Sequence, residues 1–341
     1  MPSIRSVLAY ASNFLAQVPI LQDIPNPFQS SFSTGLHGIG ESLSHPSSDN
    51  SAYYNNNDNN KNNDATSAIA TYEPLSGAPS CPINGPLSCH NSTPVDSPSC
   101  CFIHPGGRIL LTQFWDREIH VGGAEEDWTL HGLWPDLCDG TYDAYCGMAP
   151  RFNNITEVLA AYNQSDLLAF MDRYWVADRG SNAKLWMHEY NKHATCINTL
   201  APACYDVSSP LSDTATTSSS LSIKPAYSPG QEVVDYFTRA TGLFKLLDTY
   251  TALSLSGITP HERTHYPLEE VRDTLERFSG GKVVLRCGGR HHDELHEAWY
   301  VYFVQGSLQT GQFVPAQDYG AHGDANNCVP WVKYLPKRHK R

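Results

Sequence analysis

The chain has 341 residues, a length that allows one large domain or two ordinary ones. Its formal net charge of −12 at pH 7 argues against a general nucleic-acid binder, because such proteins carry a basic surface. The 15 histidines qualify that exclusion. If all of them were protonated while the carboxylates stayed ionised, the net charge would rise to about +3, and an acidic compartment would let the protein tolerate a polyanion.

The first 80 residues predict no folded domain. An apolar patch at 7–21 is interrupted by Asn13, Gln17 and Pro19, which makes it a poor signal peptide and too weak for a membrane span. Residues 22–80 are rich in Ser, Asn, Pro and Gly and cannot bury enough apolar surface to fold. We therefore expect 1–80 to be a leader with a disordered segment.

Ten cysteines all lie between Cys81 and Cys328. There is no C-x-x-C pair, and the adjacent Cys100 and Cys101 cannot easily serve one metal, so the pattern predicts a disulfide framework and an oxidising compartment. Three N-x-S/T sequons, at Asn91, Asn154 and Asn163, are compatible with glycosylation on a secretory route. We expect one folded domain over 81–336 and a solvated basic tail at 337–341.

Helix and strand patterns alternate along this domain without a βαβ rhythm, which predicts an α+β fold. The expected strands are 108–115, 282–287 and 298–306. The expected helices, besides the one discussed below, are 157–176, 231–247 and 268–278. A low-complexity stretch at 212–222 should form a long surface loop.

The segment Trp128 to Tyr142 reads W-T-L-H-G-L-W-P-D-L-C-D-G-T-Y. His131 precedes a glycine, where access to its side chain is open. Trp134 and Tyr142 offer flat surfaces on which a nucleobase could stack, at roughly 1–3 kcal/mol each. Asp136 could accept a hydrogen bond from an exocyclic amine, whereas we expect Trp128 to be part of the core.

The segment Lys184 to Cys196 reads K-L-W-M-H-E-Y-N-K-H-A-T-C. If it is helical, the i,i+4 spacing places four polar side chains on one face: His188, Glu189, Lys192 and His193. Two imidazoles, a carboxylate and an ammonium suit chemistry at a phosphate. A surface helix with incidental charges is the alternative interpretation.

Together these segments suit cleavage of RNA by attack of its own 2′-hydroxyl. That reaction needs a base for the hydroxyl proton and an acid for the leaving 5′-oxygen, which two histidines can supply. Cationic side chains would stabilise the charge that gathers on the phosphorane. No metal or other cofactor is needed, and DNA, which lacks the hydroxyl, should survive.

The stretches L-H-G-L-W-P-D and H-E-Y-N-K-H-A-T-C resemble the two active-site segments of the ribonuclease T2 family, in its fungal branch. The resemblance runs from about Cys81 to Pro336 and includes E-A-W-Y-V-Y-F near the end. It implies a single disulfide-bonded domain with a central antiparallel sheet and packed helices. It also implies a metal-independent endoribonuclease that forms 2′,3′-cyclic phosphates and then 3′-phosphates, with broad base specificity.

Carried over by position, the resemblance implies His131 and His193 as the acid/base pair and His188 as a phosphate contact. Glu189 and Lys192 would support the transition state. Trp134, Asp136 and Tyr142 would hold one base. We prefer His193 as base and His131 as acid in the first step, although the roles could be exchanged.

The family's cysteine order implies five disulfides: Cys81–Cys100, Cys89–Cys138, Cys101–Cys204, Cys146–Cys196 and Cys287–Cys328. Two positions depart from the family pattern. Ala194 stands where glycine is usual, and Leu185 stands where an aromatic residue often helps to hold a second base.

Other interpretations are weaker. His261 to His265 is a literal H-E-x-x-H, but flanking Pro260 and Pro267 oppose the continuous helix that a zinc protease needs. His291, His292 and His296 fit a solvated turn better than a metal site. A non-catalytic member of the same fold would be expected to lack His131 or His193.

The expected partner is single-stranded RNA, with rRNA and tRNA as possible substrates, and neither DNA nor a membrane. We expect a monomer in the secretory pathway, either in the vacuole lumen or secreted, with release to the cytoplasm under stress as a further possibility.

Overall fold

The computed structural model describes residues 77–90, 100–119, 124–205, 227–323 and 326–339. The predicted leader up to residue 76, the 212–222 loop and the sequon at Asn91 lie outside these ranges. No helix in the described part of the chain is long and apolar enough to cross a bilayer.

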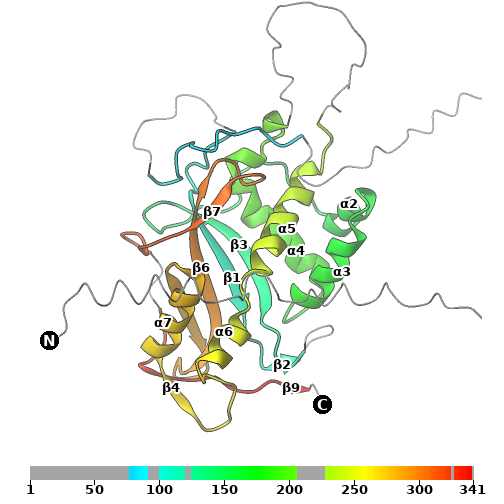
Figure 1. Cartoon of the computed structure of the whole chain (residues 1–341). Helices are drawn as coiled ribbons and strands as arrows, with labels where there is room; N and C mark the ends of the chain where they lie inside the picture. The colour runs from blue at the N-terminus through cyan, green and yellow to red at the C-terminus, as the bar shows by residue number, and fades with distance from the viewer. Residues whose placement is uncertain (1–76, 91–99, 120–123, 206–226, 324–325, 340–341) are drawn as a thin grey trace, which may run out of the picture. The chain divides into compact units, whose positions relative to one another are not determined.

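A seven-stranded, mainly antiparallel sheet forms the centre of the fold, and the α+β prediction is confirmed (Figure 1). Its main path runs β3-β1-β6-β8-β4, and β5 and β7 both pair with β6. The strands are β1 (Arg108–Phe114), β3 (Thr129–Asp136), β4 (His265–Pro267), β5 (Val283–Gly288), β6 (Glu294–Gln305), β7 (Gln312–Pro315) and β8 (Trp331–Lys333).

Strand β6 shows how the sequence builds two packed faces. Successive side chains of a strand point to opposite faces. Tyr300 and Tyr302 join the larger core on one face, while Trp299, Val301 and Phe303 join a smaller cluster on the other. Because both faces are covered, the strand is aromatic and aliphatic along most of its length.

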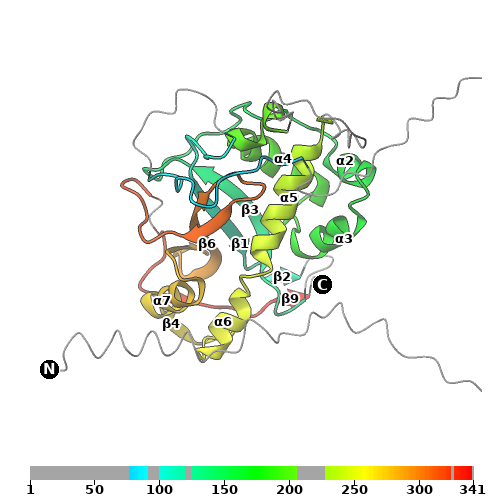
Figure 2. The same cartoon turned by 45° about the horizontal axis from the view of Figure 1, so that its top comes forward.

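Helices cover the larger face. They are α2 (Ile155–Ala161), α3 (Ser165–Tyr174), α4 (Asn182–Lys192), α5 (Gln231–Phe244), α6 (Thr249–Leu255) and α7 (Leu268–Ser279). Helices α4 and α5 run beside β3 and β1 in both views (Figures 1 and 2). Tyr190 of α4 and Tyr236 of α5 are fully buried in this core, and the Tyr236 hydroxyl donates to the Leu133 carbonyl of β3 at 3.0 Å.

The predicted helix at 157–176 is in fact two helices, α2 and α3. The chain turns at Asn163, whose φ is +55°. Asparagine tolerates this left-handed conformation better than most residues, and its place in a run of apolar spacing concealed the break. The helices predicted at 231–247 and 268–278 are confirmed as α5 and α7, with ends shifted by up to three residues.

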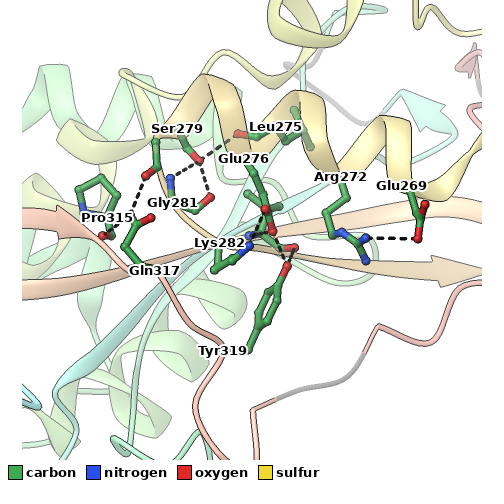
Figure 3. A network of polar contacts seen from close by, with 12 residues as sticks. Glu269, Arg272, Leu275, Glu276, Ser279, Gly281, Lys282, Pro315, Gln317 and Tyr319 are labelled. Atoms are coloured by element: carbon green, nitrogen blue, oxygen red, sulfur yellow. Dashed lines mark hydrogen bonds and ion pairs between the residues drawn. The ribbon is translucent and has the colours of Figure 1, made fainter. Parts of the chain in front are cut away.

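A polar network fastens the segment after β7 to helix α7 (Figure 3). Glu276 of α7 accepts a hydrogen bond from the Tyr319 hydroxyl and forms an ion pair with Lys282 at 2.9 Å. One residue before Tyr319, Asp318 pairs with the buried Arg108 at 2.5 Å, and Arg108 also donates to the Cys138 carbonyl at 3.4 Å. The network therefore supports the loop that follows β3.

The C-terminus is not simply a solvated tail. Strand β9 (Arg338–His339) pairs in parallel with β2 (Glu118–Ile119). The Lys337 ammonium lies 4.5 Å from the centre of the Trp115 ring and donates to the Asp127 carbonyl. Long lysine stems pack readily on aromatic surface, which the charge pattern alone did not reveal.

All ten cysteines form disulfides, and three of the five expected pairs are confirmed: Cys89–Cys138, Cys146–Cys196 and Cys287–Cys328. The other two expected pairs, Cys81–Cys100 and Cys101–Cys204, are wrong. The bonds are Cys81–Cys101 and Cys100–Cys204. Adjacent cysteines differ by one peptide unit, so spacing cannot tell their partners apart. The direction of each side chain decides the pairing.

Candidate functional site

A β-bulge places His131 at the surface of the sheet. Between β1 and β3, Thr112 pairs with Gly132 and Gln113 pairs with Leu130, so His131 is the extra residue. Its ring stacks on Phe114, with centroids 3.9 Å apart and an interplanar angle of 19°. Its carbonyl accepts a hydrogen bond from the Trp175 indole at 2.7 Å. A bulge can re-aim a side chain, and this one sets His131 out of the regular alternation of β3.

The predicted polar helix is confirmed as α4, Asn182–Lys192, which His193 ends. The Ser181 side chain caps its start by accepting from the Lys184 amide. Buried Trp186 and Tyr190 anchor its apolar face. The helical hydrogen bond from the His193 amide to the Glu189 carbonyl, at 3.0 Å, keeps the His193 ring on the same face as Glu189.

The carboxylate of Glu189 is the meeting point of both segments. His131 Nε2 lies 3.7 Å from its Oε1, and His193 Nε2 lies 3.9 Å from its Oε2. Trp134 Nε1 also donates to Oε2 at 2.8 Å, and the Trp134 ring stacks on His193 with centroids 5.0 Å apart. Residues more than 50 positions apart in the sequence thus bring two imidazole rings to one carboxylate.

Gly132 allows this approach. A Cβ atom there would fall inside van der Waals contact of both the Glu189 carboxylate and the Trp134 indole nitrogen. The residue after His131 must therefore lack a side chain if the hydrogen bond between Trp134 and Glu189 is to form.

Burial sets the charge state of the site. It lowers the pKa of His193 to about 2, with help from Lys192, His131 and His188, so this imidazole is neutral over the physiological range. Burial also raises the pKa of Glu189, which His131 and Trp134 partly oppose. His188 is more exposed, and burial together with Lys192 and His131 lowers its pKa below 6.5.

Glu297 is a site residue that was not predicted, although it lies within the E-A-W-Y-V-Y-F stretch. On β6 it pairs with Phe114, and its Oε2 lies 3.6 Å from His131 Nδ1. The Trp299 indole donates to the same oxygen at 2.5 Å. Burial raises the pKa of Glu297, but His131, Trp299 and His296 outweigh this effect and leave the pKa below its ordinary value.

Two further candidate base-binding residues, Asp136 and Tyr142, lie at and just after the end of the strand that carries Trp134. Asp136 is buried at the end of β3 and forms a backbone bridge with Tyr142. Tyr142 is 61% exposed, which leaves its ring open to a ligand. The structure therefore brings Trp134, Asp136 and Tyr142 to one edge of the site.

A sequence model of the ribonuclease T2 family matches residues 106–318, a stretch that contains both histidine segments and Glu297. The chain belongs to the ribonuclease T2 family.

Relatives support this membership. This chain is 41% identical to ribonuclease Trv of Hypocrea rufa over 258 residues. The match covers 76% of this chain and 98% of the relative. The chain is 39% identical to ribonuclease T2 of Aspergillus oryzae, over 76% of this chain and 85% of that one. A ribonuclease T2-like protein of Aspergillus fumigatus is 40% identical over 74% of this chain, but the match spans only 56% of that longer protein.

A solved structure agrees with the fold. The T2 chain superimposes on Actibind, a T2 ribonuclease, with a TM-score of 0.64 and 38% sequence identity. The match covers 76% of this chain and 99% of Actibind. The expected single disulfide-bonded α+β domain of this family is therefore confirmed.

The alternative metal sites do not form in the described part of the T2 chain, where no three His, Cys, Asp or Glu side chains are grouped to hold an ion. In the H-E-x-x-H stretch, His261 closes a turn by accepting from the amides of Arg263 and Thr264 at 3.1 Å, while His265 opens strand β4. The prolines on either side thus exclude the helix, as expected.

Two positions that depart from the family pattern lie in ordinary packing. Ala194 is buried in the 3₁₀ turn that follows α4, and Leu185 packs against the main core. Trp128 is also a core residue, as predicted, and its indole donates to the Tyr334 hydroxyl at 2.9 Å.

Proposed function

We propose that this T2-family chain is a metal-independent endoribonuclease that cleaves single-stranded RNA through a 2′,3′-cyclic phosphate and then releases a 3′-phosphate. The carrying observation is the approach of His131 Nε2 and His193 Nε2 to the same Glu189 carboxylate, at 3.7 and 3.9 Å. Two imidazoles that converge from separate segments can serve the two sides of one phosphodiester.

The environments of the two rings support different first-step roles. Burial keeps His193 neutral, which is the protonation state that the acceptor of the 2′-hydroxyl proton must have. His131 lies between the carboxyl groups of Glu189 and Glu297, at 3.7 and 3.6 Å, and this position suits it to the role of the acid that protonates the leaving 5′-oxygen. In the second step the roles reverse, with water in place of the 5′-oxygen.

Three polar side chains would serve the phosphate. His188 is exposed beside the pair, and when protonated it can bind a phosphate oxygen. Lys192 and Glu189 share its helix face and would support the charged transition state. Because the pKa of His188 lies below 6.5, its charged form requires acidic solution, so we propose an acidic working pH.

Trp134, Asp136 and Tyr142 would bind one base. The exposed Tyr142 ring offers a stacking surface for the base. Asp136 would favour a base that presents an exocyclic amine, because its carboxylate accepts a hydrogen bond. Broad specificity elsewhere is proposed because Leu185, in place of an aromatic residue, offers no stacking surface for a second base.

The wider setting is also a proposal. Five disulfides support an oxidising compartment, so we propose a secretory route that ends in the vacuole or outside the cell, with release to the cytoplasm under stress. Asn154 and Asn163 are exposed and accessible for glycosylation. We propose a monomer that acts on rRNA or tRNA and neither cuts DNA nor binds a membrane.

The test is digestion of dinucleoside monophosphates, with the products resolved by chromatography. We expect a 2′,3′-cyclic phosphate that later opens to a 3′-phosphate, at an undiminished rate in EDTA. His131→Phe and His193→Phe should each lower kcat by several orders of magnitude, whereas His265→Phe, at an exposed position, should not. Intact RNA between pH 4 and 7, or cleavage abolished by EDTA, would contradict the proposal.

A further inference from the structure

Tyr145 is an exposed aromatic residue at the edge of the site with no role so far. Its side chain is 45% exposed, and its backbone adopts a φ of +57°. A bulky residue seldom takes this left-handed conformation, which costs on the order of 1–3 kcal/mol. The ring of Tyr145 is not part of the core, and tyrosine is not a residue that favours this backbone conformation. Neither packing nor turn formation therefore explains a tyrosine at this position.

The surroundings hold Tyr145 beside the polar face of α4. Its amide donates to the Lys192 carbonyl at 2.9 Å, and its carbonyl accepts from Arg151 at 2.7 Å. The next residue, Cys146, is bonded to Cys196 just beyond the helix. Three connections thus fix the backbone of a residue whose ring remains in solvent.

The ring lies next to two basic side chains, His188 and Arg151. Its centroid lies 6.5 Å from that of His188, at an interplanar angle of 79°, and the Arg151 guanidinium lies over the ring at 5.5 Å. Arg151 is itself exposed, so its remaining N–H groups can reach a ligand. An aromatic ring beside basic side chains is the usual arrangement for binding a single-stranded nucleic acid.

We propose that Tyr145 and Arg151 form an outer nucleotide subsite, which binds the RNA chain one nucleotide beyond the two that flank the scissile phosphate. The base stacks on Tyr145, and the additional phosphate contacts Arg151. This inference rests on the proposed ribonuclease function, because His188 marks the phosphate from which the chain continues. Tyr142 serves a separate base, since it lies across the loop next to Asp136.

The test compares substrates of two lengths. Tyr145→Ala should lower kcat/KM about tenfold on a trinucleotide extended at its 5′ or its 3′ end, the loss expected from one stacked base. Cleavage of the parent dinucleotide should change less than about twofold, because that substrate does not reach the subsite. Tyr145→Phe keeps the ring and should behave as the wild type on both lengths.

Arg151→Gln tests the phosphate contact. It should weaken trinucleotide cleavage at low salt and have little effect at high salt, because a single exposed ion pair is screened. A deficit that is independent of salt would overturn the role of Arg151. Thermal unfolding of each variant controls for damage to the loop.

The outcomes separate this inference from the function on which it rests. An equal loss on both substrate lengths, or no loss on either trinucleotide, would overturn the subsite while leaving the ribonuclease intact. If the wild type cleaved no RNA, the subsite would be tested by binding instead. Calorimetry would then measure the affinity for a 2′-O-methyl trinucleotide. Tyr145→Ala should then weaken binding about tenfold, and unchanged affinity would overturn the subsite.

Discussion

His131 of β3 and Glu297 of β6 approach each other across the intervening strand β1, with Nδ1 of the ring 3.6 Å from Oε2 of the carboxylate. On the opposite side of the ring, Nε2 faces Glu189. The Trp299 indole holds the Glu297 carboxylate in place, and His296 Nε2 lies 3.9 Å from its other oxygen. Arg286, on the neighbouring strand, pairs with Glu297 in the sheet register. His131, the acid that we propose for the first step, thus faces a carboxylate that lies far along the chain from both histidine segments.

The first prediction concerns this pair. Glu297→Gln keeps the shape of the side chain but removes the carboxylate that lies 3.6 Å from His131 Nδ1. We expect kcat/KM to fall more at pH 7 than at pH 4.5. Glu269→Gln, at an exposed carboxylate, is the matched control. A uniform loss across the pH range would indicate a merely structural role.

The second prediction concerns stability in acid. His193 takes up a proton near pH 6.5 when unfolded but only at about 2 when folded, so the folded state is favoured above pH 6.5 and loses stability as the pH falls. His193→Gln removes the titrating group and therefore this pH-dependent loss of stability. Between pH 7 and pH 5 we expect the wild type to lose about 2 kcal/mol more than the variant does. Urea unfolding at both pH values measures the difference.

The control for this experiment is His265→Gln, which changes an exposed histidine. It should leave the pH dependence of the wild type unchanged. Parallel stability curves for the wild type and His193→Gln would show that the His193 ring does not remain neutral in the folded protein.

The third prediction concerns Gly132. Gly132→Ala introduces a methyl group between the Glu189 carboxylate and the Trp134 indole, so their hydrogen bond must lengthen or break. We expect kcat/KM to fall by about 10- to 100-fold and stability by about 1–3 kcal/mol. Gly242→Ala, in α5 with no atom near the added methyl, should retain activity and gain a few tenths of a kcal/mol. Wild-type activity in Gly132→Ala would refute the role of this contact.

The fourth prediction concerns base preference. Asp136→Asn replaces a side chain that only accepts hydrogen bonds with one that also donates, so a base that presents an exocyclic amine should lose its advantage. We expect the ranking of dinucleotides by kcat/KM to change by about tenfold while the best substrate keeps most of its rate. Asp143→Asn, at an exposed position in the loop that follows β3, should leave the ranking as it is. An equal loss on every dinucleotide would contradict the assignment.

The spacing of residues along the sequence correctly predicted several features of this protein. The i,i+4 positions of His188, Glu189, Lys192 and His193 required only that α4 be helical, and Trp186 and Tyr190 showed which side would be buried. Prolines at 260 and 267 were enough to reject the H-E-x-x-H helix. The alternation along β6 likewise indicated a strand. Each of these inferences depends on a few neighbouring residues.

By itself, then, the sequence determined helix α4, several other elements and the chemical types present at the site, because backbone periodicity is a local property. Only the tertiary structure decided which sulfur of Cys100 and Cys101 meets Cys81, that a bulge aims His131 at Glu189, and that Glu297 stands behind the same ring. These relations depend on strand register and on burial by distant segments. A shift of one residue in register would turn each side chain to the other face.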